Sequence, residues 1–122
     1  MCIILYCHEA GIKFLAGTDA PTFLSMPGFS LHDELKLFTQ AGFSPLEALR
    51  TATINPAKFL KATDSLGTIE KGRIANLVLL DANPLENISN TKKINAVILN
   101  GKLLERKDLD ELLNEVKQLV AK

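Results

Sequence analysis

The sequence has no net charge, because 14 Lys and Arg residues are matched by 14 Asp and Glu residues. Proteins that bind nucleic acid or anionic lipid usually carry an excess of basic residues, which produces a positive field. The balanced charge gives no reason to expect either partner. We therefore predict that the protein binds no nucleic acid and no membrane.

The sequence also lacks a long hydrophobic run, since its opening apolar stretch is only the seven residues MCIILYC. A membrane-spanning helix needs about 20 apolar residues, and a secretory signal has a basic lead and a small-residue cleavage site. Neither pattern is present, so we predict a cytoplasmic protein. Its 122 residues, 47% of them hydrophobic, suit one globular domain.

Cysteine and histidine are scarce, with two of each. A disulfide framework usually needs more cysteines and an oxidising compartment, so Cys2 and Cys7 are interpreted as small apolar residues. A structural zinc site formed by these cysteines and His8 is the alternative, since zinc accepts thiolate and imidazole ligands. Their spacing matches none of the usual zinc patterns, which makes this the weakest hypothesis.

Several catalytic motifs are missing as well. The sequence contains no GxGxxG, no phosphate-binding GxxxxGK[ST] loop, no HExxH and no GxSxG. Catalysis by a nucleophilic Ser or Cys therefore has no local support.

Helix signals dominate the first half of the chain. Gly11 predicts the left-handed end of an N-terminal helix, and residues 13–16 predict a short buried strand. A second helix is predicted to begin at Ser30, with Asp33 completing a capping box, and to stop at Gly42.

Two further helices are predicted before the pattern changes. Ser44 and Glu47 form a capping box around Pro45, which suits the first helical position. The next helix is predicted to start at Asn55 and to end near Lys61.

Strand patterns follow. The apolar run at residues 77–80 predicts a strand buried on both faces, ended by Pro84. The segment INAVILNGKLLE predicts two strands joined in a hairpin at Asn100 and Gly101. The order of elements indicates an α/β fold with too few strands to close a barrel.

A last helix is predicted from a capping box of Asp108 and Glu111. Apolar residues recur at helical spacing along one face of this helix and form a stripe. A stripe of this kind most often packs on a core, and its functional alternative is a subunit contact. The stripe consists of Leu109, Leu112, Leu113, Val116, Leu119 and Val120.

Asp19 and His32 are the candidate functional residues. Asp19 follows the predicted strand 13–16, where barrel enzymes place catalytic groups, although Asp before a Pro-rich loop is also a common turn residue. His32 lies in the first turn of a helix, whose positive end favours a neutral imidazole able to bind a ligand. The alternative for His32 is an ordinary surface histidine.

Four segments follow one another in a family-like order and spacing: HEAGIKFLAGTDAP, SLHDELKLFTQAGFSPLEALRTATINPAKFL, LGTIEKGRIANLVLLDANPLENI and INAVILNGKLL. On these segments, from residue 9 to about residue 104, the chain resembles the C-terminal part of metal-dependent amidohydrolases, particularly the imidazolonepropionase-like and prolidase-like branch. The resemblance implies a C-terminal fragment of a (β/α)8 barrel in residues 1–63, strands of a small β-sandwich in residues 64–106 and an amphipathic helix in residues 107–122.

The resemblance also implies roles for both candidates. The Asp of GTDA, matched by Asp19, ends the eighth barrel strand, contacts a divalent metal such as zinc and handles the proton of the attacking hydroxide. The His of LHDEL, matched by His32, faces the site in some members and contacts substrate. The reaction is hydrolysis of a non-peptide C–N bond, in an amide or cyclic amide, or of a dipeptide.

Departures from the family pattern limit these implications. The family takes histidine ligands from earlier strands, beginning with an HxH pair, and this sequence has no HxH. A complete barrel needs about 250 residues. We therefore expect the chain alone to bind no metal and to be inactive. Asn76 replaces an Asp found in many relatives, but only in the scaffold.

Two functional hypotheses remain beside the zinc-site hypothesis. The chain is either part of an amidohydrolase acting on a small-molecule amide or a non-enzymatic interaction and assembly module. Elements that pack on a missing barrel would expose apolar surface, so self-association, or a partner chain that supplies the rest of the barrel, is expected in both cases.

Overall fold

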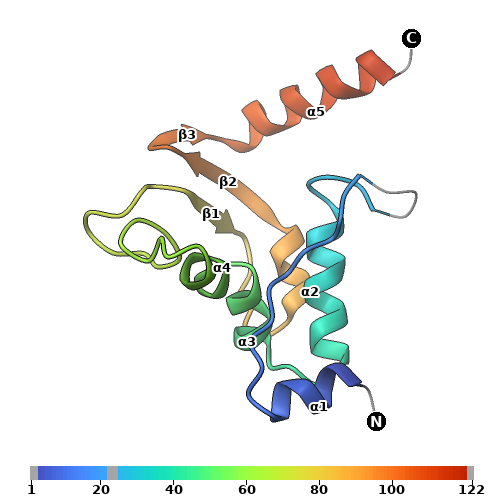
Figure 1. Ribbon diagram of the computed structural model, residues 1–122. Helices are drawn as coiled ribbons and strands as arrows, with labels where there is room; N and C mark the ends of the chain where they lie inside the picture. Colours follow the sequence, from blue (N-terminus) through green and yellow to red (C-terminus); the bar gives the residue numbers. More distant parts are fainter. Residues whose placement is uncertain (1–2, 22–24, 121–122) are drawn as a thin grey trace.

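The computed structural model describes residues 3–21 and 25–120, so Cys2 lies outside the described residues. An extended segment, residues 12–20, runs from α1 between α2 and helices α3 and α4, while a three-stranded sheet and α5 lie to one side (Figure 1). The elements are α1 (Ile3–Glu9), α2 (Ser30–Gln40), α3 (Pro45–Thr51), α4 (Ile54–Phe59), β1 (Leu77–Leu80), the 3-10 helix η1 (Ile88–Lys92), β2 (Ile94–Leu99), β3 (Lys102–Leu104) and α5 (Arg106–Val120).

The strand predicted at residues 13–16 is wrong, because this extended segment pairs with no strand among the described residues. Groups from the following helices bind its backbone instead. The Ala16 N–H donates to the Thr51 carbonyl at 2.9 Å, and Asn55 Nδ2 donates to the Phe14 carbonyl at 2.9 Å. The segment is therefore held by helices rather than by a sheet.

The hydrophobic core lies where this segment meets α2 and α3. Phe14 contacts Phe38 and Phe43 edge to face, with ring centroids 6.0 and 5.4 Å apart. Aromatic pairs prefer this geometry because the ring edge is positive and the ring face negative. The buried cluster comprises Leu35, Phe38, Phe43, Ala48 and Ile88.

The two predicted helix caps in this region differ in outcome. The capping box of Ser44 and Glu47 is confirmed, since each side chain bonds to the other's backbone N–H. The box at Ser30 is wrong: Phe29 occupies the N-cap, and Ser30 Oγ accepts a bond from the Met26 N–H at 2.6 Å. Ser30 thus stabilises the preceding turn.

The sheet is antiparallel in the order β1-β2-β3. The predicted hairpin is confirmed, and its turn residues Asn100 and Gly101 have φ values of 50° and 81°. Asn76 Oδ1 accepts a bond from the Asn100 N–H at 2.8 Å, which places Asn76 in the scaffold as expected. The prediction that residues 77–80 are buried on both faces is wrong, because β1 is an edge strand and Val78 is 56% exposed.

Helix α5 begins at Arg106, so Asp108 lies inside its first turn and not at the predicted N-cap. The predicted capping box is therefore wrong, because Asp108 Oδ2 accepts a hydrogen bond from the Glu105 N–H. Glu111 Oε1 lies 3.9 Å from Lys107 Nζ and forms an ion pair instead. Four residues of the apolar stripe, Leu112, Leu113, Val116 and Leu119, are exposed rather than packed on a core, and the side chain of Val120 lies outside the described part of the chain. Within residues 3–21 and 25–120, no helix is long and apolar enough to cross a membrane.

Candidate functional site

The candidate site lies where the extended segment ends beside the N-terminus of α2 (Figure 1). Asp19 is exposed there and has a φ of 51°, in the left-handed region. Aspartate adopts this conformation more readily than most other residues, although it is still unusual outside glycine. The turn thus presents a carboxylate to solvent on a constrained backbone.

Glu34 connects α2 to this turn. Its Oε1 accepts a hydrogen bond from the Gly17 N–H at 2.9 Å, across 17 residues of sequence. Its other oxygen, Oε2, is buried and has no hydrogen-bond partner among the described residues. The sequence-based interpretation missed Glu34, since its position inside LHDEL is the only signal and says nothing about which backbone group it meets.

His32 is where the sequence placed it, in the first turn of α2, and its ring contacts η1. His32 Nδ1 lies 3.1 Å from Thr91 Oγ1, and the Thr91 hydroxyl donates its single proton to the Ile88 carbonyl at 2.8 Å. Nδ1 must therefore carry the proton that it shares with Thr91. In the neutral ring, Nε2 is left with a lone pair that can accept a proton or bind a ligand.

The surroundings of His32 favour this neutral form. Burial lowers the pKa of His32 below its ordinary 6.5, nearby Lys92 lowers it further, and Asp33 opposes both effects. Lys92 Nζ donates to Asp33 Oδ1 at 2.6 Å, which holds the pKa of the Asp33 carboxyl below its usual range. The same ion pair ties η1 to the first turn of α2.

The described residues do not fit a catalytic metal centre on their own. Such a centre takes about three protein ligands, and residues 3–21 and 25–120 contain no group of three His, Cys, Asp or Glu side chains that could hold an ion. The remaining histidine is engaged elsewhere, because His8 stacks on Phe43 at 3.9 Å and its Nε2 lies 3.2 Å from Glu47 Oε1.

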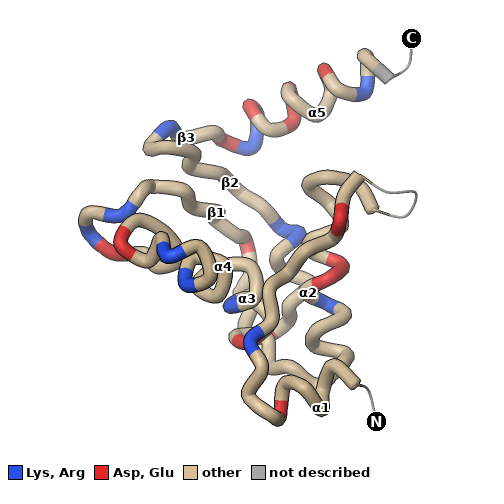
Figure 2. Tube along the Cα trace, viewed as in Figure 1, with Lys and Arg blue, Asp and Glu red and all other residues tan. Residues whose placement is uncertain are grey.

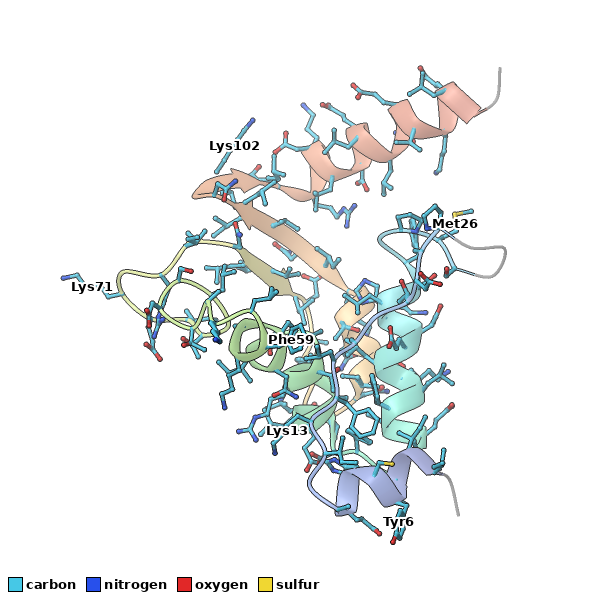
Figure 3. The ribbon with its side chains drawn as sticks, viewed as in Figure 1. Tyr6, Lys13, Met26, Phe59, Lys71 and Lys102 are labelled. Carbon is cyan, nitrogen blue, oxygen red and sulfur yellow. The ribbon has the colours of Figure 1, made fainter. Side chains whose placement is uncertain are left out.

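A separate hollow of about 730 Å³ lies between the extended segment and helices α3 and α4. Its lining includes neither Asp19 nor His32, but it does include Lys13 and Phe59, which are labelled in Figure 3. Basic positions occur on the extended segment and on α4 (Figure 2). Arg50, Lys58 and the acidic Glu47 also line the hollow, so its charged lining is mixed.

Comparison with known proteins gives a consistent result. Residues 3–104 match the sequence profile of the Amidohydrolase family. An imidazolonepropionase of Fusobacterium nucleatum subsp. nucleatum is 32% identical over 107 residues, which are 81% of this chain and 25% of that protein.

Solved structures extend the similarity to the fold. A Xaa-Pro dipeptidase with bound methionine in the active site is 33% identical with a TM-score of 0.77, covering 84% of this chain and 25% of that one. A putative prolidase from Bifidobacterium longum is 35% identical with a TM-score of 0.77, covering 92% of this chain and 29% of that one. The chain spans about a quarter of the length of these relatives.

Proposed function

The chain belongs to the amidohydrolase family, and from that membership we propose that it supplies the C-terminal part of an enzyme that hydrolyses C–N bonds. The extended segment then corresponds to the eighth barrel strand and β1 to β3 to part of the β-sandwich. The proposed substrate is a small amide, a cyclic amide or a dipeptide. The names imidazolonepropionase and Xaa-Pro dipeptidase support this range.

One observation carries the proposal: the turn bearing Asp19 is bound directly to the helix that bears His32, through the Glu34 contact with Gly17. We assign Asp19 as the general base that takes a proton and then returns it to the leaving nitrogen. We assign His32 as a substrate contact, because its Nε2 lone pair is left available by the bond from Nδ1 to Thr91.

Asp19 is also our candidate for a metal contact, as one ligand of a divalent centre in the intact enzyme. Since the described residues do not complete such a centre, we assign no metal-dependent step to this chain. We infer instead that the chain alone is incomplete and inactive, and that a longer or second polypeptide supplies the remaining ligands.

The test combines metal content, turnover and solution mass of the purified chain. Zinc or manganese is added, and hydrolysis is followed on a Xaa-Pro dipeptide and on an N-acyl amide, with Asp19→Asn as the matched variant. We expect no tightly held metal and no turnover from the chain alone. Turnover by a monomer that Asp19→Asn abolishes would support the enzyme and refute its incompleteness.

An assembly module is the second candidate, favoured by apolar side chains left in solvent. Tyr6 on α1 points away from the rest of the molecule (Figure 3) and is 62% exposed, and Phe59 is 74% exposed. Where such side chains form a contiguous apolar patch, they mark contact sites. If the chain is such a module rather than part of an enzyme, it should self-associate in light scattering, Phe59→Lys should weaken that association, and no hydrolysis should appear when a polypeptide that completes the barrel is added.

A further inference from the structure

Among residues 3–21 and 25–120, Glu34 is the last group whose hydrogen bond fixes the extended segment before the candidate catalytic residue. The Asn55 side chain donates a hydrogen bond to the Phe14 carbonyl, and the Thr51 carbonyl accepts one from the Ala16 N–H. The Glu34 carboxylate accepts one from the Gly17 N–H. Thr18 and Asp19 follow immediately. The conformation at Asp19 therefore depends on how firmly Gly17 is held.

The helix that carries Glu34 is a rigid support. Its neighbour Leu35 is 3% exposed, and Phe38 packs against two other aromatic rings of the core. A functional group placed on such an element is held more accurately than one placed on a loop. Glu34 can thus transmit the fixed position of α2 to the Asp19 turn.

The cost of this arrangement argues against an incidental contact. Glu34 Oε2 is buried without a donor among the described residues, and burying an unpaired carboxylate oxygen is unfavourable. Asp19 also adopts an unfavourable positive φ, the kind of strain that occurs at functional sites when the surroundings hold it in place. The two unfavourable features lie on either side of one hydrogen bond.

We propose that Glu34 is the positioning residue of the site: its bond to the Gly17 N–H holds Asp19 in the left-handed conformation that presents the carboxylate. The purpose of this positioning, to present the Asp19 carboxylate for catalysis, rests on the proposed function. Its structural content is independent of turnover, so the two can fail separately.

The experiment uses nuclear magnetic resonance of the full chain and compares wild type with Glu34→Ala and Glu34→Gln. The first readout is hydrogen exchange at the Gly17 amide. The second is the short intraresidue distance between the amide and Hα protons of Asp19, which a positive φ imposes. For Glu34→Ala we expect Gly17 exchange to rise about tenfold, as for one lost hydrogen bond, and the Asp19 distance to lengthen.

Glu34→Gln keeps a carbonyl acceptor and should restore both the slow exchange and the short distance. Because a neutral acceptor is weaker, the Gly17 amide proton should move upfield. If Glu34→Ala does not fold, this shift decides: an unchanged Gly17 resonance in Glu34→Gln would overturn the proposal.

Asp33→Asn is the matched control, since it removes the Lys92 ion pair from the adjacent position of the same helix. It should leave Gly17 and Asp19 as in wild type. Wild-type values in Glu34→Ala, or equal changes in Asp33→Asn, would show that Glu34 does not position the turn. Hydrolysis measurements enter neither comparison.

Discussion

The helical region around α2 and α3 holds most of the buried apolar side chains, although Leu31, Leu37 and Leu46 there are exposed, whereas the sheet and α5 bury few of theirs. Four of the five residues in the buried cluster belong to residues 35–48, and the fifth, Ile88, comes from η1. In the sheet region Ala96 is buried, but Val78, Leu79, Leu99 and Leu103 are all exposed. The two regions share one chain and differ in how far each forms its own core.

This difference separates what the chain stabilises by itself from what needs a partner surface. Burial of apolar area is the main favourable term in folding, so the helical region should hold most of the stability. The exposed faces of the sheet and α5, like Tyr6 and Phe59 in the helical region, are apolar surface that the rest of an amidohydrolase, or a second copy, would cover on binding. The candidate site lies in the stable region.

The largest loss of stability should come from the core member of a matched pair of truncations, one in the core and one in the sheet. Phe38 is 8% exposed, so Phe38→Ala should cost about 3–5 kcal/mol. Leu103 is 51% exposed, so Leu103→Ala should cost only about 1 kcal/mol or less. Urea unfolding followed by far-UV circular dichroism measures both. Equal losses of unfolding free energy in the two variants would show that the sheet is packed as tightly as the helical region.

Gly101→Ala tests whether the sheet depends on its turn. A Cβ at this position meets nothing within 4 Å, so the substitution is opposed only by the φ of 81°. Forcing alanine into the left-handed region costs about 1–2 kcal/mol. We expect that loss in urea unfolding, larger than the loss from Leu103→Ala. The opposite order would mean that side-chain packing rather than the turn stabilises the sheet.

Features set by a few neighbouring residues were predictable from the sequence. The hairpin at Asn100 and Gly101 and the capping box of Ser44 and Glu47 were correct because the interacting groups lie within three residues of one another. The same local logic predicted the existence of α2 and α5, but not their caps, since several nearby side chains compete for the same backbone groups.

Contacts between distant residues could not be predicted in this way. The bond from Gly17 to Glu34 spans 17 residues and the contact of His32 with Thr91 spans 59, so both depend on how the elements pack. The exposure of β1 was missed for a related reason. An apolar run indicates burial, but it does not say whether the burying surface is present in the same chain.

Ser44→Ala tests whether its cap or the packing of the core holds α3 in the helical region. Ser44 Oγ donates to Glu47 Oε2 at 2.6 Å and accepts from the Glu47 N–H at 3.3 Å. Losing an N-cap costs typically about 1 kcal/mol, so α3 should weaken while the core persists. Ser30→Ala is the comparison, because that hydroxyl caps no helix and binds the Met26 N–H instead, so its loss should weaken the turn before α2 and leave α3 unchanged. A Ser44→Ala protein as stable as wild type would show that packing alone holds α3.

The smallest expected effect is a pH dependence that arises at His32. Its pKa is lowered in the folded state, chiefly by burial and then by Lys92, so the unfolded chain binds a proton more readily. Stability should therefore decrease as the pH falls from the ordinary pKa of 6.5 toward the lower folded pKa. Urea midpoints measured across this range would show it, and His32→Gln should remove this contribution. Lys92→Met should reduce this pH dependence, because it removes one of the two effects that lower the pKa of His32. A midpoint that rises on acidification through this window would mean that the imidazole is bound as a cation, leaving Nε2 no lone pair for substrate.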